Sequence, residues 1–157
     1  MIAYQLRPES RGEIKLKSPD PFDAPAVHPN YLATETDQRT IIAGLKLCRR
    51  ILATPQMRSF IEAEFQPGSA VESDEELLDY ARRRGGTVYH PTSTCKMGSD
   101  PMGVVDPELR VHGVDGLRVA DASIMPTVVS GNTNAAAIMI GEKTADMVRR
   151  PAARMAA

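Results

Sequence analysis

Proline restricts regular structure at the start of this chain. Five of the twelve prolines lie within the first thirty residues, at Pro8, Pro19, Pro21, Pro25 and Pro29. Proline lacks a backbone donor and restricts the residue before it, so a helix cannot cross this region. Between these prolines, residues 13–17 (EIKLK) alternate polar and apolar side chains, which is the period of a half-exposed strand. The sequence therefore predicts one short strand and then an extended segment that reaches Pro29.

Four helices are predicted in the rest of the chain. Apolar residues recur at helical spacing over residues 37–53, and a short helix is expected at 57–65. A Ser and a Glu three residues apart form a capping box that opens a helix over 73–84. The last helix is expected at 132–149, and its nearly all-apolar first half predicts burial.

The β-prone segments lie between the last two helices. Residues 87–89 are predicted to form a short strand, and residues 109–111 and 117–120 a strand, turn and second strand. Together these elements predict an α+β fold. The expected divisions are residues 1–88, residues 89–150 and a tail at 151–157.

Charge and composition exclude several classes of protein. The 157 residues carry a formal net charge of −1, so no basic nucleic-acid-binding surface is expected. No apolar run approaches the roughly 18–20 residues that span a bilayer, and the first ten residues lack the pattern of a signal peptide. Two cysteines are too few for a disulfide framework. We therefore expect a reduced, cytoplasmic protein without a transmembrane segment, with a peripheral position at the inner membrane as the alternative.

Few residues in the chain are suited to chemistry. His90 is favoured among the three histidines because it follows a predicted strand and enters a loop. His90 and Cys95 lack the further ligands that zinc requires, so no metal site is expected. Neither a G-x-S-x-G elbow nor a G-x-G-x-x-G dinucleotide loop is present. Two alternatives stay open: Cys95 beside Lys96 as a reactive thiol, and residues 130–135 as a helix start that is either simply capped or faces a ligand.

Several motifs together are more specific than any of these features alone. In the order of the chain they are LRPESRG at 6–12, SPDP at 18–21, PNYL at 29–32, YHPTSTCKMG at 89–98, GLRVADASIMP at 116–126, SGNTNA at 130–135 and IMIGEK at 138–143. This order and spacing closely resembles the C-terminal region of the glucose–methanol–choline (GMC) oxidoreductases, most of all their choline dehydrogenase and alcohol dehydrogenase branch. The resemblance extends over about residues 4–149.

The resemblance implies an FAD enzyme that oxidises an alcohol by hydride transfer to the flavin. His90 matches the family's catalytic histidine, and Asn132 matches its second catalytic position. A base such as His90 takes the alcohol proton, while the amide of Asn132 holds the substrate oxygen. The family positions that contact FAD are matched by Asp121, Ala122, Asn132, Thr133 and Asn134. His112 matches a turn position with no catalytic role.

The family's FAD-binding half, with its G-x-G-x-x-G loop, has no counterpart in this sequence. The resemblance therefore implies the C-terminal portion of the GMC fold: part of the antiparallel substrate-domain sheet with its helices, plus the last strand and helix of the FAD domain. Its expected partners are a small alcohol, choline or another primary alcohol, and either the missing half or a second copy of the chain. A catalytically inactive remnant or binding module remains the alternative, and a hydrolase built on His90 and Cys95 is a third possibility.

Overall fold

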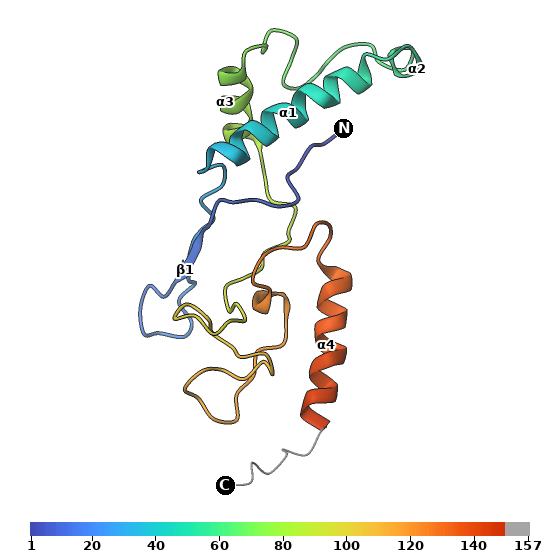
Figure 1. Cartoon of the computed structure of the whole chain (residues 1–157). Helices are drawn as coiled ribbons and strands as arrows, with labels where there is room; N and C mark the ends of the chain where they lie inside the picture. The colour runs from blue at the N-terminus through green and yellow to red at the C-terminus, as the bar shows by residue number, and fades with distance from the viewer. Residues whose placement is uncertain (150–157) are drawn as a thin grey trace. The chain divides into compact units, whose positions relative to one another are not determined.

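The chain divides into two units, Met1–Thr87 and a second unit that begins at Val88. The structure is a computed structural model, and it describes residues 1–149 (Figure 1). The tail predicted at 151–157, and the last residue of the division predicted at 89–150, lie outside the described residues. Short antiparallel strands and separate helices confirm the α+β class. None of the helices within residues 1–149 has both the length and the apolar character needed to cross a bilayer.

A two-stranded hairpin is the β-structure of the first unit. Strand β1, Glu13–Lys15, pairs antiparallel with β2, Ala26–His28, in the register that places Ile14 opposite Val27. The predicted strand is thus two residues shorter than expected, and the prediction missed β2. Prolines bound β2 on both sides and leave it only three residues, which is compatible with an edge strand but gives almost no pattern. Gly12 is required beside it, because a Cβ there would lie 2.3 Å from the His28 carbonyl oxygen.

Helix α1, Glu35–Leu52, is the longest element of the first unit. Its N-cap is Thr34, whose hydroxyl accepts a hydrogen bond from the amide of Asp37, and it begins two residues earlier than predicted. Helix α2 covers only Pro55–Arg58, so the prediction of residues 57–65 was wrong in extent. The chain leaves α2 through successive i to i+3 hydrogen bonds, from Phe60 to Met57 and from Ile61 to Arg58.

Helix α3, Asp74–Arg84, packs against α1. The predicted capping box is confirmed: the Ser73 hydroxyl accepts from the Glu76 amide, and the Glu76 carboxylate accepts from the Ser73 amide. The side chain of Leu77 is fully buried, and Ala81 lies one turn further on the same buried face. In Figure 1, α1 and α3 lie side by side.

The second unit is built from loops around one short and one long helix. The 3₁₀ helix η1, Ala122–Ile124, contacts helix α4, Asn134–Arg149. Five buried apolar residues form the core of this unit, and they come from the loops, from η1 and its end, and from α4: Val105, Leu109, Ile124, Met125 and Ile140.

The strands predicted in the second unit are not formed as continuous elements. Tyr89 has a φ of 60°, in the left-handed region, so residues 87–89 cannot be a strand. Residues 109–111 and 117–120 do approach as an antiparallel pair, but only through the isolated bridge between Arg110 and Arg118. Leu109 has a φ of 63° and ends the pairing on one side, while the turn at 113–116 ends it on the other.

Helix α4 is less buried than its composition predicted. It begins at Asn134 rather than at residue 132, and Ile140 is its only buried residue within the described part of the chain. Ile138 is 60% exposed and Met139 is 52% exposed. The prediction of a buried first half was wrong for this structure, because only one face of α4 meets the core of its own unit.

Candidate active site

His90 lies between two side chains that come from the start of the last helix. Its Nδ1 is 3.0 Å from the Thr133 hydroxyl oxygen, and its Nε2 is 3.1 Å from Oδ1 of Asn132. The histidine is thus held at both ring nitrogens by residues more than forty positions away. Of the predicted site residues, these three are brought into direct contact, and two of them are the predicted catalytic pair.

The segment before α4 presents its two side chains in different environments. Thr133 is buried, with 9% of its surface exposed, and its carbonyl accepts the first backbone hydrogen bond of the helix, from Ala137. Asn132 is exposed, so a small molecule has access to its amide. The buried Thr133 therefore contacts the imidazole at Nδ1, and the exposed Asn132 contacts it at Nε2.

Asp121 and Ala122 lie in the same unit as His90, at the start of η1, which contacts α4. Asp121 caps η1, since its Oδ1 accepts a hydrogen bond of 2.7 Å from the Ser123 amide. The segment is tied to the loop after His90 by two backbone hydrogen bonds, from Cys95 to Ser123 and from Met97 to Ile124. The structure thus joins the η1 segment to the His90 loop.

The two remaining predicted cofactor residues, Ala122 and Asn134, are not the hydrogen-bond partners of the His90 ring nitrogens. Ala122 is half-buried against the core of the unit. Asn134 is exposed and is the first residue of α4. The amides of the first residues of a helix have no carbonyl partner within it, so α4 offers donors and a partial positive charge at this end.

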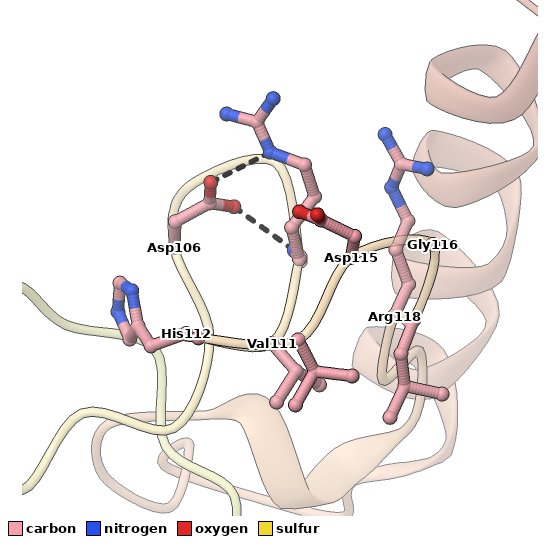
Figure 2. Close-up of a pocket in the computed structure, with 10 residues that line it drawn as sticks. Asp106, Val111, His112, Asp115, Gly116 and Arg118 are labelled. Atoms are coloured by element: carbon pink, nitrogen blue, oxygen red, sulfur yellow. Dashed lines mark hydrogen bonds and ion pairs between the residues drawn. The ribbon is translucent and has the colours of Figure 1, made fainter.

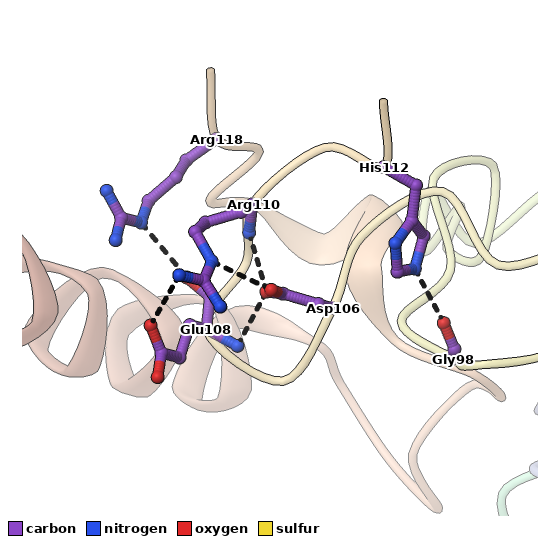
Figure 3. A network of polar contacts seen from close by, with 6 residues as sticks. All are labelled: Gly98, Asp106, Glu108, Arg110, His112 and Arg118. Atoms are coloured by element: carbon purple, nitrogen blue, oxygen red, sulfur yellow. Dashed lines mark hydrogen bonds and ion pairs between the residues drawn. The ribbon is translucent and has the colours of Figure 1, made fainter. Parts of the chain in front are cut away.

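Neither His112 nor Cys95 is a hydrogen-bond partner of the His90 ring. Nε2 of His112 lies 2.9 Å from the Gly98 carbonyl oxygen, so this nitrogen carries a proton and donates it (Figure 3). Cys95 is half-buried, and both nitrogens of His90 face other residues, so no Cys95–His90 pair is formed. Within residues 1–149, no three His, Cys, Asp or Glu side chains gather as a metal site.

A polar network around Asp106 stabilises the loop that holds His112. The carboxylate accepts from the amides of Glu108 and Arg110 and from Nε of Arg110 at 2.8 Å (Figure 3). Burial alone would raise the pKa of Asp106, but the hydrogen bonds from Arg110 and Glu108 outweigh it and hold the pKa below its usual value. Arg118 donates to the Glu108 carbonyl. These hydrogen bonds stabilise the turn, and we assign the network no part in a reaction.

A shallow pocket is lined by Asp106 and residues 110–118 (Figure 2). None of its lining residues belongs to the predicted site. At its rim the Asp106 carboxylate accepts a hydrogen bond of 2.8 Å from Nε of Arg110, so these two charges are paired with each other.

The family resemblance predicts Thr133 at the cofactor, and the contact of its hydroxyl with His90 is a feature that the sequence did not predict. The hydroxyl is adjacent to Asn132 in the sequence, but adjacency does not reveal which way a side chain points. The only sequence feature that could have predicted this contact is the chemistry of the two side chains. A partly buried neutral imidazole needs a hydrogen-bond partner at each nitrogen, and a hydroxyl can serve either as donor or as acceptor.

The chain matches the C-terminal sequence model of the family described as GMC oxidoreductase over residues 8–141. It is 50% identical over 145 residues to the alcohol dehydrogenase (acceptor) of Pseudomonas putida, which covers 92% of this chain and 26% of that protein. It is also 50% identical over 154 residues to the mitochondrial choline dehydrogenase of Homo sapiens, which covers 94% of this chain and 26% of that protein. The chain therefore spans about a quarter of the length of these relatives.

Solved structures show the same relationship. Pyridoxine 4-oxidase from Mesorbium loti superposes with a TM-score of 0.84 at 36% identity, over 90% of this chain and 28% of that one. An Aspergillus oryzae RIB40 formate oxidase variant, studied for its FAD modification, gives a TM-score of 0.85 at 34% identity, over 92% of this chain and 26% of that one.

Proposed function

Because this chain belongs to the GMC oxidoreductase family, we propose that it supplies the base and the substrate-orienting amide of an FAD-dependent alcohol oxidation. The observation that carries the proposal is the contact between His90 Nε2 and the Asn132 side chain at 3.1 Å. An alcohol oxygen within reach of both groups has a proton acceptor on one side and an amide on the other. This pair of groups is suited to removing the proton of an O–H bond.

His90 and Asn132 have different roles in this reaction. His90 takes the hydroxyl proton at Nε2, which raises the electron density on the oxygen and weakens the adjacent C–H bond. Asn132 cannot take a proton at neutral pH, so its part is to fix the direction of the C–O bond. FAD, when bound, supplies the acceptor for the hydride.

The described residues have the donors and acceptors to hold part of a flavin. The first amides of α4 and the positive end of its dipole suit the electron-rich edge of a flavin ring, and they are contributed by the region of Asn134. Asp121 uses Oδ1 to cap η1 and keeps Oδ2 for a hydroxyl or N–H donor. A carboxylate is a poor partner for phosphate, so we assign Asp121 and Ala122 to the non-phosphate part of FAD.

We propose that the substrate is a small primary alcohol, choline or another. Relatives named for choline and for alcohol are equally similar to this chain, at 50% identity each. Following the same family relationship, residues 1–88 belong to the substrate-binding portion, and residues 89–150 to the catalytic loop and the end of the FAD-binding domain. The partner is an FAD-binding half or a second copy, because α4 exposes Ile138, Met139 and Val148.

A chimera tests this function directly. The C-terminal quarter of the Pseudomonas putida alcohol dehydrogenase is replaced by this chain, and alcohol oxidation is measured with an artificial electron acceptor. We expect turnover of primary alcohols, and a fall of roughly 10²–10⁴-fold in kcat with His90→Ala, because that is the usual contribution of a positioned base. His112→Ala serves as the matched control, since its ring only braces a turn.

Two outcomes contradict the proposal. A flavin-loaded chimera without turnover would favour the inactive remnant or binding module. Turnover that survives His90→Ala but not Cys95→Ala would favour the thiol chemistry that the sequence left open.

A further inference from the structure

Asp115 is followed by Gly116, and no other Asp or Asn in the 157 residues precedes a glycine. The two residues lie on the exposed turn that lines the shallow pocket of the second unit (Figure 2). Because glycine has no Cβ, its backbone nitrogen can approach the side chain before it more freely than that of any other residue. The pair therefore brings a side-chain carboxyl and a backbone amide within reach of a reaction with each other.

Both reacting groups are unconstrained in the structure. Within residues 1–149, no hydrogen bond or ion pair joins the Asp115 carboxylate or the Gly116 amide to another group. Gly116 has a φ of 76°, and a Cβ built on it would meet no atom within 4 Å. The turn is thus not packed against the protein on this side, and both groups face solvent.

The other aspartates in the loops of the second unit lack this combination. Asp100 and Asp106 each precede a proline, which has no N–H to attack the carboxyl group. Asp121 precedes alanine, and its Oδ1 accepts a hydrogen bond of 2.7 Å from the Ser123 amide. Among the loop aspartates of residues 88–149, Asp115 is therefore the one whose carboxyl and following amide are both free.

We propose that Asp115 is a site of spontaneous isomerisation to isoaspartate. The Gly116 amide nitrogen attacks Cγ of Asp115, a C–N bond forms, and the carboxyl oxygen leaves as water with the amide proton, which gives a five-membered succinimide. Water then opens the ring. Opening at the former backbone carbonyl leaves the peptide bond on Cγ and a free α-carboxylate, so the product has unchanged mass and nothing is oxidised or reduced. The reaction is independent of the alcohol oxidation proposed above.

Isoaspartate lengthens the backbone of the turn by one carbon atom. The turn connects the two segments that meet at the Arg110–Arg118 bridge, where the Val111 amide donates to the Leu117 carbonyl at 3.0 Å. The new α-carboxylate is exposed with the turn, and it is the group that isoaspartyl methyltransferases esterify with a methyl group from S-adenosylmethionine. The turn is therefore a modification site for this class of repair enzyme.

Ageing of the purified 157-residue chain at neutral pH for several weeks tests the proposal. Trypsin then cuts after Arg110 and Arg118 and releases residues 111–118, which contain the site. Chromatography separates isoaspartate from aspartate in this peptide, and an isoaspartyl methyltransferase with labelled S-adenosylmethionine marks it. A synthetic peptide of residues 111–118, aged in parallel, gives the rate without the fold. We expect the folded chain to form isoaspartate at a rate of the same order as the peptide.

Two substitutions keep the exposed turn and change only the reacting group. Asp115→Glu should abolish the label, because its closure needs a six-membered ring, which forms much more slowly. Asp115→Asn should accelerate the reaction, because its amide leaves as ammonia more readily than a carboxylate oxygen leaves as water. The tryptic peptide of residues 97–110, with its two Asp–Pro bonds, is the internal control and should stay unlabelled.

Two results overturn the proposal. A folded chain that forms isoaspartate at residue 115 far more slowly than the synthetic peptide would show that the turn protects the site. A label on residues 111–118 that persists in Asp115→Glu would show that another group reacts.

Discussion

At the scale of single residues, the side chains that matter most are those that connect distant segments. In the second unit, His90 connects its loop to the residues just before α4. In the first unit, Asp37 connects α1 to residues 9–10. The Asp37 carboxylate accepts from the amides of Glu9 at 2.9 Å and Ser10 at 2.8 Å, and only 3% of the residue is exposed. Both residues fix a loop to a helix by pairing every polar atom that they bury.

Replacing Asp37 by Asn is expected to destabilise the first unit by about 1–3 kcal/mol at pH 7, because an amide cannot accept from both Glu9 and Ser10. Burial acts to raise the pKa of Asp37, but these hydrogen bonds outweigh it, so the pKa lies below its ordinary value in the folded chain. The stabilisation is therefore complete above about pH 4, the pKa of an unfolded Asp, and is lost as the pH falls through the folded pKa.

Urea unfolding of the wild-type chain and Asp37→Asn, compared at pH 7 and near pH 3, measures this effect. The difference in unfolding free energy should shrink at the lower pH. Glu35→Gln is the matched control on the same helix turn; its side chain is exposed and pairs with the exposed Arg39, so we expect a change of at most about 0.5 kcal/mol. A difference that stays constant with pH contradicts the assigned role of the carboxylate.

At the scale of elements, the capping box at α3 is a local device with a measurable contribution. Ser73→Ala removes the acceptor of the Glu76 amide and is expected to cost about 1 kcal/mol. Amide exchange at Leu77, whose side chain is fully buried, reports the loosening of α3, together with the free energy of unfolding. Ser73→Thr keeps a hydroxyl acceptor and serves as the control. Equal exchange in Ser73→Ala and the wild type would show that packing on α1 alone fixes this end.

Elements with local signals were predictable, and elements made by pairing were not. The capping box and the proline after α1 marked helix ends to within two residues or so, because caps and breakers act within one turn. Strand β2 is three residues long and forms by pairing with β1, while the left-handed backbone at Tyr89 excludes the strand predicted at 87–89; no local sequence pattern records either feature. The site shows the same contrast: the motifs identified His90 and Asn132, but the direction of the Thr133 side chain came only from the fold.

At the scale of the whole molecule, the chain covers about a quarter of its relatives, yet it holds the proposed proton acceptor and its neighbours. What it does not contain is the sequence of a dinucleotide-binding loop. Such a loop surrounds a pyrophosphate with backbone amides at the start of a helix, and a few side chains around the flavin ring do not replace it. We therefore expect the residues that take the alcohol proton and the residues that give most of the affinity for FAD to lie in different stretches of sequence.

We accordingly expect the 157-residue chain alone to bind FAD weakly or not at all, although its His90–Asn132–Thr133 cluster is formed. The absorbance of the purified chain after incubation with FAD and gel filtration measures this, and the chimera is the control, because it carries the same C-terminal residues with a complete dinucleotide loop. The chimera should retain stoichiometric flavin and the isolated chain little. Stoichiometric yellow colour in the isolated chain would mean that residues such as Asp121 and Asn134 hold the cofactor unaided.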